Sequence, residues 1–390
     1  MGRVPSDVTL ENWQTAPHLH WAFQHMADFL PTAAISRGDD PVAELPPAPQ
    51  GLADITLDDP NTGARRTVGD VMDTTDTDGW IVMQHGRVVA EQYYDGMTAD
   101  TPHLLMSVSK SLISTVVGAL VGSGGLDVDA ELTRYVPALA ESGYAGATVR
   151  NLLDMRSGIT FSEEYLNPLA EVRLLEQAID WAPRTVPEVP GTMYDFLLTL
   201  RQGSAHGGPF NYRSCETDVL GWVCEAAAGV PMPDLMSTLV WSKLGAQTDA
   251  IIGIDSVGTG MFDGGINAGL RDLARFGSLL LTGGVSLTGT QVVPAAWIAD
   301  TLAGGADSRA AFAACAEDNR MPGGMYRNQF WLPYPGDNVV MCIGIHGQMI
   351  YIDRAAQMVA AKLSSWPLPQ EAAKLYPTMA AFAAVAAALS

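Results

Sequence analysis

Residues 103–122 read HLLMSVSKSLISTVVGALVG, a polar turn that runs into an apolar helix pattern. Apolar side chains recur at helix-face spacing in Leu112, Ile113, Val116, Val117, Leu120 and Val121. Such a stripe predicts a helix with a buried face. The glycines at 122, 124 and 125 supply the stop signal. We therefore expect one buried helix that starts close to Ser107.

Ser107 and Lys110 form an S-x-x-K pair at the start of this helix. Positions i and i+3 share a helix face, so the lysine ammonium can reach the serine Oγ. A serine hydroxyl needs an adjacent base to become a nucleophile. Lys110 can be that base only if its pKa is lowered, which burial and the positive helix N-terminus favour. The alternative is a capped helix with a surface lysine, although an unpaired lysine in an apolar helix is costly.

Strand-like runs lie on both sides of this helix and far apart in the chain. Before it, residues 80–83 and 88–93 flank QHGR, a hairpin signal. After it, the runs cover residues 329–334, 339–346, 349–353 and 358–365. Such strands need partners, so we predict an α/β (α+β) fold in which both chain ends form one antiparallel sheet flanked by helices.

Helical patterns dominate the middle of the chain, including residues 148–155, 217–228 and 232–244. We therefore predict a sheet domain made of residues 1–130 and 250–390, and a mostly helical inserted domain of residues 131–249. The active site is expected in the cleft between them. The alanine-rich end, residues 379–390, predicts a final packed helix.

Two further elements complete the candidate site. Tyr212 follows the GGPFN turn and precedes an apolar helix pattern, so its phenol can relay protons near the nucleophile; the alternative is a packed tyrosine. Ile345, His346 and Gly347 end a predicted strand, where backbone N–H groups can form an oxyanion hole. A glycine there allows the close approach of a ligand, although a tight turn explains it equally.

Together these elements resemble the serine β-lactamase and penicillin-binding-protein superfamily, in its class C and esterase branch. Within it, the chain is similar to the nylon-oligomer hydrolases, which act on 6-aminohexanoate dimers. Stretches that carry the resemblance are ENWQTAPHLHWAF, FLPTAAISR, HLLMSVSKSL, DGGINAGLRDLARFG, CIGIHGQ and KLSSWP. The resemblance implies a β-lactamase-like fold and a homodimer.

The resemblance also implies a role for each site residue. Ser107 becomes acylated, and Lys110 and Tyr212 manage the protons. The backbone N–H groups of Ser107 and Ile345 form the oxyanion hole. Tyr165 occupies the place of a loop tyrosine that closes on the amide substrate.

Further substrate-binding residues follow from the same resemblance, with departures from the family pattern. Glu176 stands about where the family places an aspartate that holds the substrate's amine. Asp263 occupies a pocket position where asparagine or histidine is usual. His346 and Gly347 lie beside the substrate. The departures concern the amide substrate more than the hydrolase chemistry.

The composition of the chain limits the kinds of partner that it can bind. The chain of 390 residues has a formal net charge of −21, which argues against nucleic acid and anionic membranes. Four cysteines without metal-like or disulfide-like spacing, and no secretory pattern near the start, favour the cytoplasm. We expect a small-molecule substrate and neither a cofactor nor a metal, because the sequence lacks nucleotide-binding and metal-site signatures.

Three functions remain open from the sequence. The leading one is hydrolysis of amide or ester bonds in short linear substrates through a Ser107 acyl-enzyme. A β-lactamase or D-alanyl-D-alanine carboxypeptidase is the alternative enzyme, although His346-Gly347-Gln348 stands where such enzymes carry Lys-Thr-Gly. The third is a non-catalytic binding module on the same fold.

Overall fold

The computed structural model describes residues 4–316 and 320–390. Its helices are α1 Leu19–Gln24, α2 Val68–Asp73, α3 Val108–Gly122, α4 Val149–Leu153, α5 Glu171–Ala178, α6 Met193–Thr199, α7 Cys215–Ala228, α8 Met232–Met236, α9 Ser242–Leu244, α10 Leu270–Ser278, α11 Ala295–Ala303, α12 Ser308–Ala313 and α13 Ala372–Leu389. Its strands are β1 Thr32–Ile35, β2 Thr56–Asp58, β3 Arg65–Thr67, β4 Thr77–Gln84, β5 Arg87–Tyr93, β6 His103–Leu104, β7 Ala250–Gly253, β8 Ile266–Ala268, β9 Met325–Arg327, β10 Phe330–Leu332, β11 Val339–Gly344, β12 Gln348–Asp353 and β13 Met358–Ser364.

The large sheet joins the two ends of the chain. Within the described residues it has seven strands in the order β5-β4-β13-β12-β11-β10-β9, and every neighbouring pair is antiparallel. The β4–β5 hairpin turns at His85 and Gly86, whose φ angles of 48° and 74° suit the turn that matches strand twist. The predicted α+β fold with an antiparallel sheet flanked by helices is therefore confirmed.

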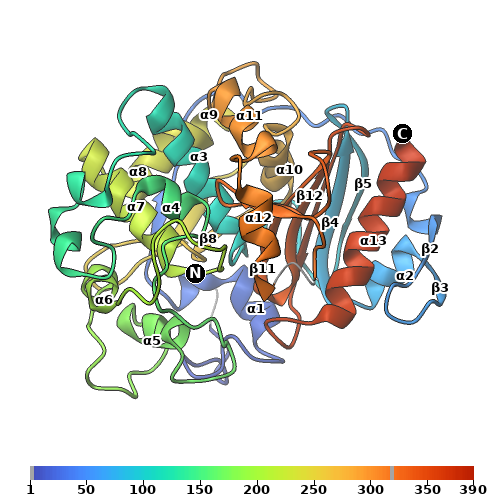
Figure 1. Ribbon diagram of the computed structural model, residues 1–390. Coiled ribbons are helices and arrows are strands. Elements are labelled where there is room, and N and C mark those ends of the chain that lie inside the picture. Colours follow the sequence, from blue (N-terminus) through green and yellow to red (C-terminus); the bar gives the residue numbers. More distant parts are fainter. Residues whose placement is uncertain (1–3, 317–319) are drawn as a thin grey trace.

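Alternating side chains of the sheet feed two apolar cores. Trp80 and Val82 of β4 pack in the core covered by α2 and α13, whereas Ile81 and Met83 pack in the larger core that includes α3 and α10. Period-two alternation in a strand produces this division. Figure 1 shows α13 and α2 on the outer side of the sheet and the helices α4 to α8 gathered at the opposite side of the molecule.

A second sheet was not predicted. It has the order β1-β7-β8-β6 among the described residues, and its strands are two to four residues long. Strands this short carry too few residues for an alternating pattern to show. The division into a sheet domain and a domain of residues 131–249 stays a prediction.

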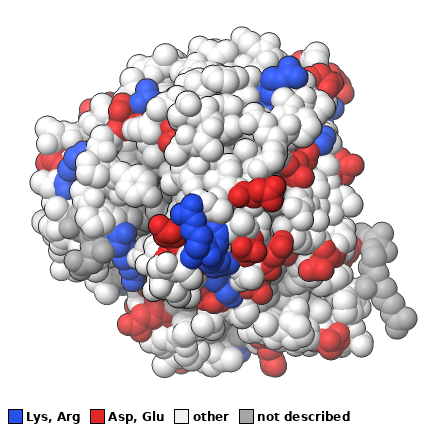
Figure 2. All heavy atoms as spheres, turned by 90° about the vertical axis from the view of Figure 1, so that its right-hand side faces the viewer, with Lys and Arg blue, Asp and Glu red and all other residues white. Residues whose placement is uncertain are grey.

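Helix α13 has two properties that bear on its environment. In the part of the chain that the structure describes, it alone is long and apolar enough to cross a membrane by length and composition. Its residues Phe382 and Val385 are buried against the large sheet. Figure 2 looks onto this side of the molecule, where acidic side chains surround a small group of basic ones.

Candidate active site

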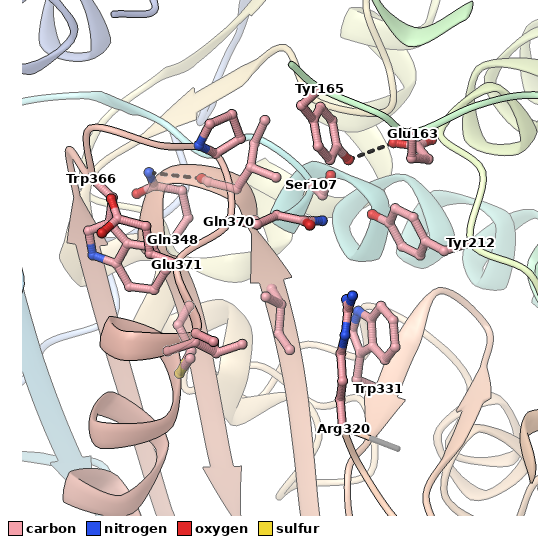
Figure 3. A pocket seen from close by; sticks show the side chains of 18 of the residues that line it. Ser107, Glu163, Tyr165, Tyr212, Arg320, Trp331, Gln348, Trp366, Gln370 and Glu371 are labelled. Carbon is pink, nitrogen blue, oxygen red and sulfur yellow. Dashed lines mark hydrogen bonds between the residues drawn. The ribbon is translucent and has the colours of Figure 1, made fainter. Parts of the chain in front are cut away.

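A strained turn presents Ser107. Strand β6 ends at Leu104, and the Leu105 N–H donates to the Ile266 carbonyl at 2.8 Å. Met106 then takes a φ of 46°, a left-handed conformation that is unfavourable for a bulky residue and is concentrated at functional sites. Ser107 follows as the N-cap residue of α3. The turn places its side chain at the cavity shown in Figure 3.

Lys110 lies one turn along α3, and only 1% of its surface is exposed. Its Nζ lies 3.0 Å from the Ser107 Oγ and 3.1 Å from the Ser214 Oγ. It also donates to the Asp263 carbonyl at 2.8 Å and lies 3.4 Å from the Asp263 Oδ2. The helical spacing thus brings the predicted serine and lysine into direct contact.

The charge of Lys110 is the reverse of the sequence expectation. Burial by itself lowers the pKa of Lys110, as predicted. The nearby groups Tyr212, Asp263, Glu163 and Asp218 raise that pKa, however, to the extent that each is ionised. The net pKa is raised above the ordinary lysine value, so Lys110 is an ammonium at neutral pH.

Tyr212 stands on the other side of the serine, just before α7. The Lys110 Nζ lies 5.2 Å from its ring centroid, and the ring stacks on Trp331 with 5.5 Å between centroids. Burial raises the pKa of Tyr212, while the Lys110 charge and hydrogen bonding with Ser107 and Lys110 partly offset that rise. The phenol is therefore neutral at neutral pH and close to both partners.

Glu163 is a site residue that sequence reasoning missed. Its carboxylate accepts a hydrogen bond from the Tyr165 hydroxyl (Figure 3) and others from the N–H and the hydroxyl of Ser214. Burial raises its pKa, and the Lys110 charge opposes that rise. Glu163 thereby links the loop of Tyr165 to the serine that contacts Lys110. In the sequence, Glu163 is marked only by its place two residues before Tyr165. Glu164 is a neighbouring acid in nearly the same place, so position alone does not single out Glu163.

A cavity of about 460 Å³ opens in front of Ser107. Of the predicted residues, Ser107, Tyr165, Tyr212, Ile345 and Gly347 line it. Its other walls are mostly apolar and come from Phe161, Met321, Trp331, Ile343, Met349, Trp366, Leu375 and Tyr376. Ser107 and Tyr212 thus face a space whose walls are largely apolar.

Glu176 and Asp263 do not line this cavity, and this corrects two predictions. Both oxygens of Glu176 accept from the Arg173 guanidinium, at 2.7 and 2.8 Å, and Gln14 donates to the same carboxylate. Its charge is neutralised inside the protein. Asp263 lies behind Lys110, 4% exposed, so it faces the lysine rather than a substrate.

His346 is a third correction. It is fully buried, and its Nδ1 lies 2.7 Å from the Trp366 carbonyl. Burial lowers the pKa of His346 to about 4. The neighbouring Gly347 lines the cavity, but the close approach that it permits is to Trp366, because a Cβ there would lie 2.3 Å from the indole ring. The sequence pattern located the turn but not what packs against it.

Comparisons with known proteins agree with this geometry. The family model described as Beta-lactamase matches residues 64–384. The chain therefore belongs to the beta-lactamase family, and its relatives are hydrolases. An esterase of this group, EstB from Burkholderia gladioli, is 29% identical over 180 residues, which are 43% of this chain and 45% of the esterase.

Within the family, the chain is a homologue of 6-aminohexanoate-dimer hydrolase. The enzyme of that name from Paenarthrobacter ureafaciens is 40% identical over 373 residues, which cover 94% of this chain and 91% of the relative. A solved structure from Bacillus anthracis, proposed to be a 6-aminohexanoate-dimer hydrolase, is 25% identical with a TM-score of 0.90. It covers 100% of this chain and 99% of that one.

Proposed function

We propose that this hydrolase cleaves amide or ester bonds of short linear substrates through an acyl-enzyme on Ser107. The observation that carries the proposal is the 3.0 Å contact between the Lys110 Nζ and the Ser107 Oγ at the end of the cavity, with the Tyr212 phenol beside both. A nucleophile in contact with proton-handling groups at the base of a pocket supports acyl transfer.

Each proton that leaves Ser107 or water is returned within one catalytic cycle. The Ser107 Oγ attacks the substrate carbonyl, and its proton passes to the Lys110–Tyr212 pair, which has previously lost one proton. Backbone N–H groups of Ser107 and Ile345 hold the oxyanion. As the intermediate collapses, Tyr212 returns a proton to the leaving amine or alcohol. Water then attacks the acyl-enzyme, the pair accepts its proton, and Ser107 regains a proton as the carboxylic acid leaves.

The charges of the pair predict a rise in activity with pH. The pKa values of Lys110 and Tyr212 are both raised, so the reactive form that lacks one proton is a minor species at neutral pH. Its population, and with it kcat/KM, increases as pH rises toward those pKa values. This holds whichever of the two residues accepts the Ser107 proton.

The cavity favours an extended apolar chain with a charged end. The carboxylate of Glu371, which lines it, is paired with Lys374 at 2.8 Å, and that of Glu163 is held by Tyr165 and Ser214. Arg320 also lines the cavity, and no hydrogen-bond or ion-pair partner is found for it among the described residues. Figure 3 shows it beside Trp331, reaching toward the space in front of Tyr212.

These features support a substrate with a carboxylate at one end of its chain. The free charge at the cavity is positive, whereas the acid predicted to hold an amine, Glu176, is already neutralised by Arg173. Amides of the 6-aminohexanoate-dimer type, named in the relative, fit this description, whereas short acyl esters lack the carboxylate and make use of the apolar walls and the nucleophile alone. Homodimerisation and a cytoplasmic location stay predictions from the sequence.

Turnover of p-nitrophenyl acetate, p-nitrophenyl butyrate and 6-aminohexanoate dimer by the wild type and by Ser107→Ala tests the proposal. We expect ester turnover to be abolished in Ser107→Ala and a fluorophosphonate to label wild-type Ser107 stoichiometrically. Ser123→Ala, at the exposed end of the same helix, is the matched control. Full activity of Ser107→Ala would overturn the proposal, and fast nitrocefin turnover would favour a β-lactamase instead.

A further inference from the structure

Behind Lys110 lies a buried carboxyl group that the proposed mechanism does not use. Asp218 is on α7 and has no exposed surface. Its Oδ1 accepts the backbone N–H groups of Phe262 and Asp263, both at 3.0 Å. Its Oδ2 is buried and has no hydrogen-bond partner among the described residues. An orphaned buried oxygen of this kind requires a physical explanation.

Asp263 shows the complementary arrangement. Its Oδ2 lies 3.4 Å from the Lys110 Nζ, and its Oδ1 is buried without a partner in the described part of the chain. Two neighbouring acids thus contribute one unpaired oxygen each. The Asp218 carboxyl is anchored to the backbone N–H of Asp263, so the two side chains belong to one cluster.

The charges around Lys110 decide how this cluster is protonated. The groups that face it are Tyr212, Asp263, Glu163 and Asp218. With all three acids ionised, a single ammonium would stand against three buried or half-buried negative charges. Burying unpaired charge is costly, and two adjacent carboxylates avoid it by keeping a proton on one of them.

The contacts identify which acid keeps the proton. The Asp263 Oδ2 lies 3.4 Å from the Lys110 Nζ, an ion-pair contact that Asp218 does not share. Burial raises the pKa of Asp218 well above its usual range, and the charge of Asp263 raises it further. The two N–H bonds to the Asp218 Oδ1 favour the ionised form, but their effect on the pKa is smaller than that of burial, and the carbonyl oxygen of a neutral acid still accepts both. A proton on Oδ2 would make that orphaned oxygen a donor, and the Asp263 Oδ1 is an acceptor in the same cluster that is unpaired within the described residues.

We propose that Asp218 is a neutral carboxylic acid that donates its proton to Asp263, and that it is a positioning residue that fixes Asp263 as the counter-ion of Lys110. The pH-profile part of this inference rests on the proposed function, because Lys110 is taken to handle protons. The protonation of Asp218 does not rest on it. Without the Asp218 donor, the negative form of Asp263 is less stabilised and Asp263 takes up a proton more readily. The Lys110 ammonium then loses its counter-ion.

The test compares Asp218→Asn, Asp218→Leu and Asp263→Asn in the full chain. The side-chain amide introduced by Asp218→Asn keeps an acceptor and a donor, so this variant is expected to retain the wild-type pH profile of ester kcat/KM. Asp218→Leu and Asp263→Asn are expected to move the rising limb to lower pH. A merely structural role for Asp218 would lower Tm without moving the limb.

Infrared spectroscopy gives a readout that does not depend on catalysis, which makes failure of the inference distinguishable from failure of the proposed function. The difference spectrum of wild type minus Asp218→Asn is expected to show the carbonyl stretch of a protonated carboxylic acid near neutral pH. The subtraction removes the band of other protonated acids such as Glu216, whose pKa burial raises to about 8. If the difference spectrum lacks that band, or if Asp218→Asn moves the pH limb as far as Asp263→Asn, Asp218 carries charge and the inference is wrong. This holds even if Asp218→Leu fails to fold.

Discussion

The chain buries two lysines, and their surroundings shift the two pKa values in opposite directions. Lys110 on α3 is 1% exposed, and Lys362 on β13 is 0% exposed. The Lys362 Nζ donates to the Thr75 carbonyl at 3.2 Å and to the Ser364 hydroxyl, and lies 5.5 Å from the Trp366 ring. Burial lowers the pKa of Lys362 to about 7, against only partial opposition from Asp78 and Asp76.

Contact with negative groups, and not burial, decides the charge of a buried lysine in this protein. Lys110 has the Asp263 carboxylate at 3.4 Å, and the carboxyl group of Glu163 faces it as well. Lys362 has neutral oxygen partners and no carboxylate within ion-pair distance among the described residues. Equal burial is therefore compatible with a charged lysine beside the nucleophile and with a lysine inside the sheet whose pKa lies near neutral pH.

The first prediction separates the two lysines by function. Lys110→Met is expected to lower kcat/KM for p-nitrophenyl butyrate by about a thousandfold, because loss of a proton-handling group typically costs 10²–10⁴-fold. Lys362→Met is expected to stay within about threefold of the wild type, a change that corresponds to well under 1 kcal/mol. Losses of similar size in both folded variants would contradict the assignment of Lys110 to the site.

The second prediction concerns a variant that lacks the contact between Asp263 and Lys110. Asp263→Asn takes away a negative charge close to Lys110, and an opposite charge at such a distance shifts a pKa by roughly 1–3 units. The pKa of Lys110 falls, so the rising limb of kcat/KM should move to lower pH by about one unit. Kinetics across the stable pH range measure this shift. An unmoved limb would mean that Asp263 does not set the charge of the pair.

The same contrast explains what could be predicted from the sequence. The spacing of Ser107 and Lys110 is a property of one helix, and one-dimensional periodicity is enough to bring them together. Most of the large sheet was predicted because its longer strands show their pattern, whereas the three-residue strand β9 was not predicted. Lys362 stands in such a strand as well, yet its surroundings could not be read from the pattern.

The rest depends on contacts between distant segments. Asp263 faces Lys110 across 153 positions of sequence, and Glu176 meets Gln14 across 162. No local pattern shows that one acid lies behind the lysine and the other is already neutralised. Glu163 was missed for the same reason, since its partner Ser214 lies 51 positions away. The direction of the Lys110 pKa shift was wrong because its acids come from other elements.

The third prediction concerns the loop that carries Tyr165. Tyr165→Phe removes the hydroxyl that donates to Glu163 at the cavity. We expect about a tenfold loss in 6-aminohexanoate-dimer hydrolysis and less than threefold in ester hydrolysis, because a poor leaving group needs more transition-state stabilisation. Paired measurements of kcat/KM on both substrates give the ratio. Equal losses would assign Tyr165 a general structural role.

A fourth prediction concerns Arg320, the cavity's unpaired cation among the described residues. Arg320→Met is expected to raise KM about fivefold for mono-(4-nitrophenyl) adipate, because a charge-assisted hydrogen bond to its carboxylate is lost. The KM for p-nitrophenyl hexanoate, a neutral ester of the same chain length, should be unchanged. Arg65→Met on β3 is the control variant. Equal effects on both esters would exclude carboxylate recognition by Arg320.

The fifth and smallest effect is on stability and belongs to Lys362. Its pKa is about 7 in the folded chain against an ordinary 10.5, so between these values the unfolded chain binds a proton that the folded chain has lost. The free energy of unfolding therefore rises with pH across that window, by roughly 2 kcal/mol between pH 7 and 9. Lys362→Met lacks this contribution, so its Tm should rise less with pH, or fall more, than that of the wild type. Parallel Tm curves for the two proteins would mean that Lys362 keeps its proton like Lys110, and the contrast between the two lysines would then disappear.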